Sequence, residues 1–368
     1  MAKGTLGDVC IKAGSNIAQK DLIGNTGCYP IFGAGGFIQN VDFYQQEEPY
    51  IAIVKDGAGI GRAMMLPAKS SVIGTMQYIL PKDSQSVDLE YLYYAIANMN
   101  LGKYFSGATI PHIYFRDYQN EPINLPDLDE QRMIARIFKR IDELTIKRKE
   151  QIEALNELVK SRFIELFGDP VDNEMQWPTK SLEEACRVIV DCPHSTPNYT
   201  SQNTGFMCIR TSIVKKNYII WDDIEFISEE EYNKRIQRKK PEKGDVIYTR
   251  EGAILGIAAV IDKECNVALG QRAMLLSPDA NQCNSIFLCN AMNCDSFLAN
   301  ALKGQSGSAS PHINVGDIKA FKMIMPPIKL QQQFAAFVAQ VDKSKFVVQK
   351  SLQELEILKK SLMQQYFG

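Results

Sequence analysis

Long hydrophobic runs are missing from this chain, since no stretch of 18 consecutive apolar residues occurs among its 368 residues. The first four residues also lack the apolar core of a signal peptide. Both absences predict a soluble, cytoplasmic protein that has no membrane partner. Because 45% of the residues are hydrophobic, the chain has enough apolar material for two globular cores, and we expect more than one domain.

Close cysteine pairs are missing as well. Nine cysteines are present, but none forms a Cys-x-x-Cys pair, and the closest spacings are those of Cys186 with Cys192 and of Cys283, Cys289 and Cys294. Structural zinc sites usually use such close pairs. We therefore predict no metal site and interpret the cysteines as small, buried hydrophobic residues.

An excess of positive charge is also absent, since the formal net charge is −2. This argues against a protein that coats nucleic acid through basicity alone, but it does not exclude local basic surfaces. The densest basic run covers residues 234–243 and follows acidic residues at 222–223 and 229–231. The pattern leaves two interpretations open, a solvated face of mixed charge and a loop that contacts phosphate groups.

Histidine is scarce, with only His112, His194 and His312 in the chain. His112 and His312 each lie between a proline and an isoleucine, and neither has a nucleophile or a carboxylate beside it in the sequence. Acid–base or nucleophilic catalysis needs such a partner. We therefore interpret both histidines as parts of structural turns.

What the chain does contain is an internal repeat. Residues 311–368 align with residues 111–168 without a gap, with 14 identities in 58 positions. Chance pairing of typical compositions gives about three or four. The identities include Pro-His-Ile at both starts, Gln131 with Gln331, and Phe-Gly at both ends. We interpret the two segments as copies of one unit.

Each copy predicts a long helix. After Pro126 or Pro327, neither glycine nor proline occurs until Gly168 or Gly368, and apolar residues recur at helical spacing. Two such helices are suited to pair with each other. The apolar stripe turns polar at residues 147–151, where we expect a bend, a frayed seam or a partner contact. The residues predicted to pair the helices are Ile134, Phe138, Ile141, Leu155, Leu158, Phe334, Val338, Val341, Leu355 and Leu358.

The regions between the repeats are predicted to be mixed α/β units. In the first, strands are expected at residues 50–54, 63–66 and 71–80, and a helix at residues 87–99. The second shares this plan and has an insertion of about 19 residues between residues 191 and 245.

Glycines follow a predicted strand at Gly57, Gly59 and Gly61, and the second region keeps two of them as Gly252 and Gly256. A tight turn is favoured over a cofactor loop, because β-like residues continue on both sides. A close approach of this backbone to a ligand stays open.

These features together resemble the DNA-specificity subunits of type I restriction-modification systems. In that family a Pro-His-Ile-like turn precedes a helix that starts Pro-x-Leu-x-Glu-Gln and ends near Phe-Gly. The corresponding helix starts are Pro126-Asp127-Leu128-Asp129-Glu130-Gln131 and Pro326-Pro327-Ile328-Lys329-Leu330-Gln331. The second copy departs from the family pattern at Leu330, where glutamate is usual. The resemblance covers essentially the whole chain.

The resemblance implies an α+β fold. Two mixed α/β target recognition domains would each be followed by a long helix, and the two helices would pair as an antiparallel coiled coil with pseudo-two-fold internal symmetry. The recognition domains would occupy residues 1–125 and 171–325, and the helical spacer regions would occupy residues 126–170 and 326–368.

The resemblance further implies a non-catalytic subunit that reads an asymmetric bipartite DNA target. Its partners would be double-stranded DNA, two adenine methyltransferase subunits and restriction/translocase subunits, and it would need no cofactor. Two alternatives stay open, a stand-alone sequence-specific DNA-binding protein and a self-contained DNA methyltransferase. The absence of an Asn-Pro-Pro-aromatic or Asp-Pro-Pro-aromatic box counts against the second.

Base reading would rest on cationic and amide side chains on loops and strands, because arginine can bind guanine bidentately and glutamine can bind adenine. His194, in a loop between Pro193 and Pro197, is either part of a solvated turn or a DNA contact. The other candidates for DNA binding are Lys55, Arg62, Arg116, Arg210, Lys239, Lys240, Arg250, Gln271 and Arg272.

Overall fold

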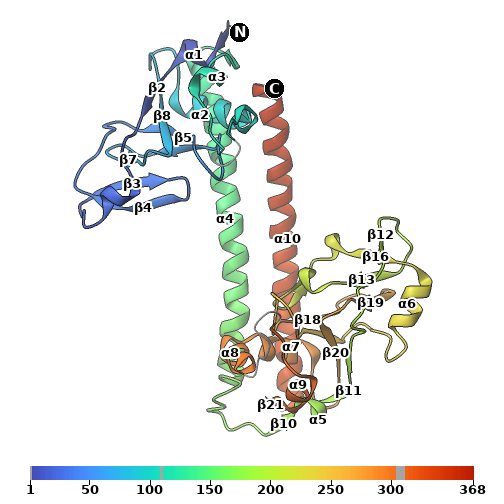
Figure 1. Cartoon of the computed structure of the whole chain (residues 1–368). Coiled ribbons are helices and arrows are strands. Elements are labelled where there is room, and N and C mark those ends of the chain that lie inside the picture. The colour runs from blue at the N-terminus through green and yellow to red at the C-terminus, as the bar shows by residue number, and fades with distance from the viewer. Residues whose placement is uncertain (1, 108–110, 304–310) are drawn as a thin grey trace. The chain divides into compact units, whose positions relative to one another are not determined.

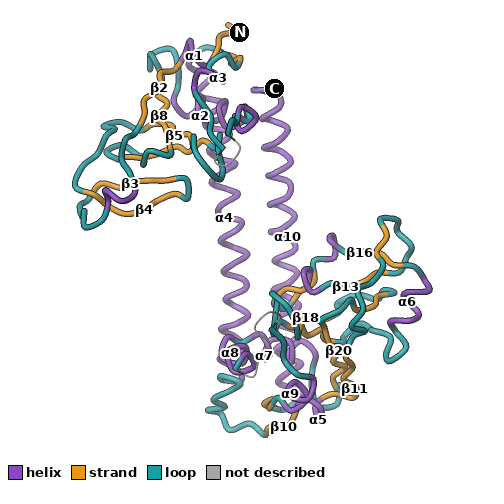
Figure 2. Tube along the Cα trace, viewed as in Figure 1, coloured by secondary structure: helices purple, strands orange, loops and turns teal. Residues whose placement is uncertain are grey.

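The computed structural model describes residues 2–107, 111–303 and 311–368, which divide into two compact units. Unit 1 comprises residues 1–149 and 349–368, and unit 2 comprises residues 150–348. Figure 1 shows that strands, short helices and parts of two long helices make up each unit, and Figure 2 separates these classes by colour. Each unit is described here by itself.

The strands of unit 1 are β1 (Ala2–Thr5), β2 (Cys10–Gly14), β3 (Tyr29–Gly33), β4 (Gly36–Val41), β5 (Tyr50–Val54), β6 (Ala63–Leu66), β7 (Ser71–Val72), β8 (Met76–Pro81) and β9 (Pro122–Leu125). An antiparallel sheet has the order β2-β8-β5-β6, and a second sheet has the order β4-β3-β7 with a parallel β3–β7 pair. β1 pairs with β9. The short helices are α1 (Leu6–Val9), α2 (Leu89–Asn98) and α3 (Phe115–Tyr118), with 3-10 turns η1 (Gln19–Leu22) and η2 (Leu101–Tyr104).

Strand β5 is central to unit 1 because it is buried on both faces. Its residues alternate between two clusters, with Ile51 and Ile53 on the side of helix α2 and Tyr50, Ala52 and Val54 on the other side. This explains why its sequence is a continuous apolar run. The predicted strands at residues 50–54 and 63–66 and the helix near residues 87–99 are confirmed.

The strand predicted at residues 71–80 is instead two strands, β7 and β8. A turn separates them, in which the N–H of Met76 donates to the carbonyl of Ile73. The N–H of Gly74 turns away to the carbonyl of Ile17. As a result β7 joins one sheet and β8 the other.

Unit 2 repeats this plan. Its strands are β10 (Thr179–Ser181), β11 (Cys186–Asp191), β12 (Tyr199–Thr200), β13 (Met207–Ile209), β14 (Val214–Lys215), β15 (Tyr218–Ile219), β16 (Glu225–Ile227), β17 (Val246–Thr249), β18 (Ala258–Val260), β19 (Val267–Leu269), β20 (Ala273–Pro278) and β21 (Lys322–Ile324). Its short helices are α5 (Leu182–Ala185), α6 (Glu229–Arg235), α7 (Ser285–Asn293), α8 (Asp295–Leu302) and α9 (Val315–Ala320), with 3-10 turns η3 (Thr211–Ile213) and η4 (Trp221–Asp223).

The order β11-β20-β17-β18 matches β2-β8-β5-β6, and the parallel β13–β19 pair matches β3–β7. A capping box starts both α1, through Thr5 and Asp8, and α5, through Ser181 and Glu184. The duplication therefore extends beyond the helical repeat to the α/β regions. The elements β12, β14 to β16 and α6 lie between residues 191 and 245, where the insertion was predicted.

The long helices are α4 (Leu128–Phe167) and α10 (Ile328–Phe367), each of 40 residues. The first part of α4 and the last part of α10 belong to unit 1, and the remaining parts belong to unit 2, so the helices pair antiparallel. Both are continuous through the polar stretch at residues 147–151 and its counterpart. Gly168, at φ +70°, caps α4 as predicted. No helix in the described part of the chain is long and apolar enough to cross a membrane.

The residues of α4 and α10 that face each other form the helix seam. They recur with a repeat of seven positions, and the seam is largely apolar at its two ends. In unit 1, Phe138 packs against Tyr366 with ring centroids 6.3 Å apart, and Lys359 forms an ion pair with Asp142. In unit 2, Phe163 packs against Phe334 at 5.5 Å. Near the middle, Arg148 donates to the hydroxyl of Ser351 at 3.2 Å, so the polar stretch forms a polar seam and not a break in the helix.

Most of the predicted pairing residues are buried or half-buried. Leu158 and Leu358 are exceptions, because they are 48% and 47% exposed. The seam instead takes the next residue of each helix, Val159, which is 7% exposed, and the half-buried Lys359. Apolar residues spaced three and four positions apart in the sequence do not show whether a given residue faces the partner helix or lies one position beside that face. The buried or half-buried pairing residues are Ile134, Phe138, Ile141, Leu155, Phe334, Val338, Val341 and Leu355.

A buried glutamine fastens each long helix to its α/β region. The amide of Gln331 accepts from the N–H of Asn284, the cap of α7, at 2.8 Å, and donates to the carbonyls of Gln282 and Pro326. Gln131 makes the equivalent three bonds around Asp88, the cap of α2. This explains why both repeats keep glutamine at this position.

Replacing Gln331 with leucine should therefore destabilise unit 2. The substitution keeps the volume but leaves one N–H and two carbonyls without partners, each of which costs about 1–3 kcal/mol where it stays buried. Thermal unfolding of the full chain measures the loss. Gln332→Leu is the matched control, because Gln332 is exposed on the same helix. Equal shifts for the two variants would contradict the fastening role.

Candidate nucleic-acid interface

In both units the glycine turn is held by the Pro-His-Ile turn through backbone hydrogen bonds. Gly57 donates to the carbonyl of Pro111 at 2.9 Å, and Ile113 donates to the carbonyl of Lys55 at 2.9 Å. In unit 2, Gly252 donates to Pro311 and Ile313 donates to Arg250, both at 2.9 Å. Two short motifs that are distant in sequence thus form one structural feature, which occurs twice.

The tight-turn interpretation of the glycines is confirmed. Gly57, Gly59 and Gly61 have φ between +80° and +83°, and Gly252 and Gly256 have φ of +91° and +79°. At Gly61 the backbone of Gly102 approaches so closely that a Cβ would lie 2.3 Å from its nitrogen. The middle glycine faces open space apart from the side chain of Arg62.

His112 has a carboxylate partner that its sequence neighbours did not reveal. Its Nδ1 contacts Asp56, which the glycine turn brings alongside, and its ring packs on Tyr114 with centroids 4.1 Å apart. Partial burial lowers the pKa of His112, and the positive charge of Lys55 lowers it further. The histidine therefore has the structural place that was predicted, but with a carboxylate beside its ring.

The three candidates in unit 1 differ in how available they are. Arg62 is exposed and follows the glycine turn directly. Arg116 has a 74% exposed side chain that lies over the ring of Tyr114 at 4.6 Å. Lys55 is only 25% exposed and lies 3.9 Å from Asp56. Arg62 and Arg116 are thus more open to a ligand than Lys55.

In unit 2, Lys239 and Arg210 are tied to internal partners. Lys239 forms ion pairs with Glu242 at 2.8 Å and with Asp245 at 3.3 Å. Arg210 lies 3.2 Å from Glu225. Lys240 is exposed. Part of the basic run at residues 234–243 therefore stabilises the fold instead of facing solvent.

Arg250 was a candidate for base contact, and the structure buries it in an ion pair. Its side chain is 8% exposed and donates to both oxygens of Asp191, at 2.9 and 3.1 Å. It is therefore not placed to contact a base. Gln271 accepts from the hydroxyl of Thr196 at 2.9 Å, and Arg272 is 46% exposed at a left-handed φ of +74°.

Sequence reasoning missed how Asp191, Arg235 and His194 come together. Arg235 has a side chain that is only 1% exposed and binds the backbone of Ser195, while Asp191 lies 3.0 Å from His194. The available signal was weak. It consisted of a carboxylate and a histidine three residues apart in a proline-bounded segment.

The long helices expose large apolar side chains at matching positions of the two repeats. Ile146 is 57% exposed and its counterpart Phe346 is 67% exposed. Leu158 and Leu358 form a second such pair. Single exposed apolar residues are common, but retention at the same places in both copies points to a shared use.

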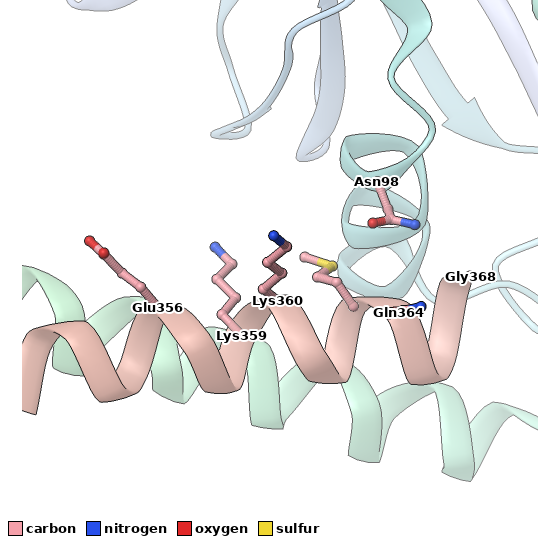
Figure 3. A pocket seen from close by; sticks show the side chains of 7 residues that line it. Asn98, Glu356, Lys359, Lys360, Gln364 and Gly368 are labelled. Carbon is pink, nitrogen blue, oxygen red and sulfur yellow. The ribbon is translucent and has the colours of Figure 1, made fainter. Parts of the chain in front are cut away.

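A surface hollow of about 460 Å³ lies in unit 1 between the ends of α2 and α10. Figure 3 shows that Glu356, Lys359 and Lys360 line it from α10, opposite Asn98 of α2. Lys359 is already paired with Asp142. The hollow is largely a gap between helix side chains, and no catalytic grouping lines it.

Six of the nine cysteines are buried, as predicted, but Cys28 is exposed and Cys265 and Cys294 are intermediate. Burial raises the pKa of Cys10 to about 12, so this thiol stays protonated near neutral pH. Within residues 2–107, 111–303 and 311–368, no group of three or more histidine, cysteine or acidic residues is arranged to hold a metal ion.

Comparison with known proteins agrees with the duplicated architecture. The model of the type I restriction modification DNA specificity domain matches residues 1–156 and again residues 175–357. This chain belongs to that family. Two specificity subunits of Methanocaldococcus jannaschii, of the MjaVIII and MjaIX type I restriction enzymes, are 23% and 24% identical to it. The alignments cover 85% and 77% of this chain and 77% and 69% of those proteins.

Two solved structures share the fold. The type I S subunit from M. genitalium is 18% identical, with a TM-score of 0.64 over 100% of this chain and 96% of that one. A chain from a structure of type I R-M complex assembly and conformational transition is 17% identical, with a TM-score of 0.55 over 100% and 97%. The predicted α+β architecture with two related domains and paired helices is confirmed. Membership in the family makes this a type I specificity subunit, and such subunits are not themselves catalytic.

Proposed function

We propose that this chain reads an asymmetric, bipartite DNA target and directs an adenine methyltransferase and a restriction/translocase subunit to it. The observation that supports this best is that one α/β scaffold occurs twice with different side chains at equivalent positions. Where unit 2 has the paired Arg250 and Asp191, unit 1 has Lys55 and Gly14 at the equivalent ends of β5 and β2. Related scaffolds that differ in their side chains are suited to two different half-sites.

The exposed cations of each unit support DNA contact. Arg62 and Arg116 in unit 1, and Lys240 and Arg272 in unit 2, are exposed in a chain whose overall charge is −2. Binding would therefore depend on local groups and not on a general positive field. For unit 1 we keep Lys55 as a weaker candidate. For unit 2 we keep Lys239, Arg210 and Gln271 as candidates for DNA contact. We no longer propose that Arg250 contacts a base directly.

Two copies of one methyltransferase fit the helices best. Ile146 with Phe346, and Leu158 with Leu358, repeat the same exposed apolar residues on α4 and α10. Since an apolar patch at a repeated position offers a repeated docking surface, two equivalent partner molecules would be expected.

We place the limits between the recognition domains and the helical spacer regions near residues 125, 170 and 325.

Two other functions remain as competitors. A stand-alone DNA-binding protein would not need a methyltransferase, and a self-contained methyltransferase would bind its methyl donor without a partner. The sequence contains no methylation box for the second. The repeated apolar helix positions favour the partner-dependent function over the first.

The test is co-expression with the cognate methyltransferase subunit in a methylation-deficient host, followed by genome-wide mapping of methylated adenines. We expect methylation at one asymmetric split motif, and none when this chain is omitted. Methylation that does not depend on this chain, from a soluble and assembled complex, would contradict the proposal. Methylation by this chain alone would support the enzyme alternative.

A further inference from the structure

The loop at residues 191–197 of unit 2 is exposed at its tip but firmly anchored at its base. Buried Arg235 donates to the carbonyl of Ser195 at 2.8 Å, and Thr196 donates to Gln271 at 2.9 Å. The N–H of Cys192 donates to Ala273 at 3.1 Å. A loop held at several points loses little conformational freedom when it binds a ligand.

Asp191 is the main anchor. Arg250 donates to its two carboxylate oxygens from Nε and Nη2, at 2.9 and 3.1 Å, and Arg238 donates to its backbone carbonyl at 3.1 Å. The carboxylate is therefore fixed in position and orientation. Its second oxygen also lies 3.0 Å from Nε2 of His194, whose side chain is 63% exposed.

This contact decides what His194 can recognise. An ionised carboxylate offers only lone pairs, so the tautomer of His194 that carries its hydrogen on Nε2 is favoured beside Asp191. In the neutral ring Nδ1 is then an acceptor. In the major groove the donors available to an acceptor are the exocyclic amino groups of adenine and cytosine.

We propose that His194 is a specificity-determining residue of the second recognition domain, and that it accepts a hydrogen bond from the amino group of an adenine or cytosine. Asp191 is a positioning residue, which acts on the base only through His194, and Arg250 holds Asp191. This inference rests on the proposed DNA-reading function. To that function it adds the residue that reads the base, the acceptor atom and the class of base that is read.

The arrangement is specific to unit 2. The strand equivalent to β11 ends in Gly14, which has no side chain to orient a histidine, and Lys55 in place of Arg250 lies beside Asp56. The first recognition domain therefore cannot read its half-site with this device. Such a difference is expected where two copies of one scaffold have acquired different targets.

The inference is tested on the assembled complex with the methyltransferase. Binding to the mapped target is compared with binding to duplexes that carry one base-pair change at each position. His194→Ala should reduce discrimination at a single base pair of one half-site by roughly 2- to 12-fold, as expected for the loss of one hydrogen bond. The other half-site should be read as before. Glu230→Ala, an exposed change on α6 of the same unit, is the control that should alter nothing.

Asp191→Asn separates positioning from simple structural support. It retains an oxygen for Arg250 but no longer fixes the hydrogen on Nε2 of His194. Discrimination at the same base pair should fall in the otherwise wild-type complex. In the His194→Ala background the change should have no further effect at that position, whereas a purely structural role would lower discrimination again.

The outcomes distinguish the two proposals. If the unaltered complex methylates one split motif and His194→Ala keeps full discrimination at every position, the inference is overturned and the proposed function stands. Loss of discrimination in both half-sites by the folded variant would also overturn it. If the unaltered complex shows no motif that depends on this chain, the proposed function fails first.

Discussion

Exchange of residues 181–325 for the corresponding domain of another family member should replace one half of the DNA target and leave the other half unchanged. The reason is that unit 2 has its own sheets and its own hydrophobic cores, which include Val246, Met274 and Phe287. Strand β21 lies inside the exchanged segment, whereas most of its partner β10 (Thr179–Ser181) lies outside it, so the donor β21 must pair with the retained β10. Each half of the DNA motif should therefore be either replaced completely or left unchanged.

Mapping of methylated adenines with the chimeric complex measures this result. The reciprocal exchange of residues 2–125 is the matched experiment and should replace the other half only. The donor domain must offer the cap and core residues that Gln331 and the end of α4 contact, because both lie outside the exchanged segment. A change in both halves after either exchange would defeat the modular interpretation.

Features set by local sequence could be predicted without the structure. The two long helices follow from apolar spacing and from the absence of glycine and proline, and their boundaries were placed within a few residues. The buried strand at residues 50–54 is marked by five apolar residues in a row. The repeat showed that two copies of one architecture are present, since equal sequence patterns require equal local structure.

Features that depend on distant residues could not be predicted. The sequence made Arg250 a candidate for DNA binding, but Asp191, which lies 59 positions away in sequence, holds it in a buried ion pair. The same holds for His112, whose carboxylate partner Asp56 comes from a different turn. Leu158 fits the apolar stripe as well as Val159 does, and only the orientation of the partner helix decides between them.

Replacement of Phe167 by alanine should cause the largest loss of stability of any single change at the helix ends. Its side chain is fully buried and packs against Phe287 at 4.8 Å and Phe334 at 5.6 Å. Removing a buried phenylalanine side chain costs about 3–5 kcal/mol, because the cavity collapses only in part. For a unit of this size that lowers the unfolding midpoint by roughly 6–20 °C. Thermal unfolding of the full chain followed by circular dichroism measures it.

Phe367→Ala is the control that the repeat itself provides. Phe367 is the equivalent last residue of α10 and packs against Tyr91 at 5.2 Å and Phe138 at 5.6 Å, but it is only half-buried. Because less buried apolar surface is removed in Phe367→Ala, the loss of stability should be clearly smaller than for Phe167→Ala, and it should affect unit 1. Equal losses would mean that the C-terminal helix end is as tightly enclosed in solution as the end of α4. A larger loss for Phe367→Ala would contradict the assignment of Phe167 as the stronger anchor.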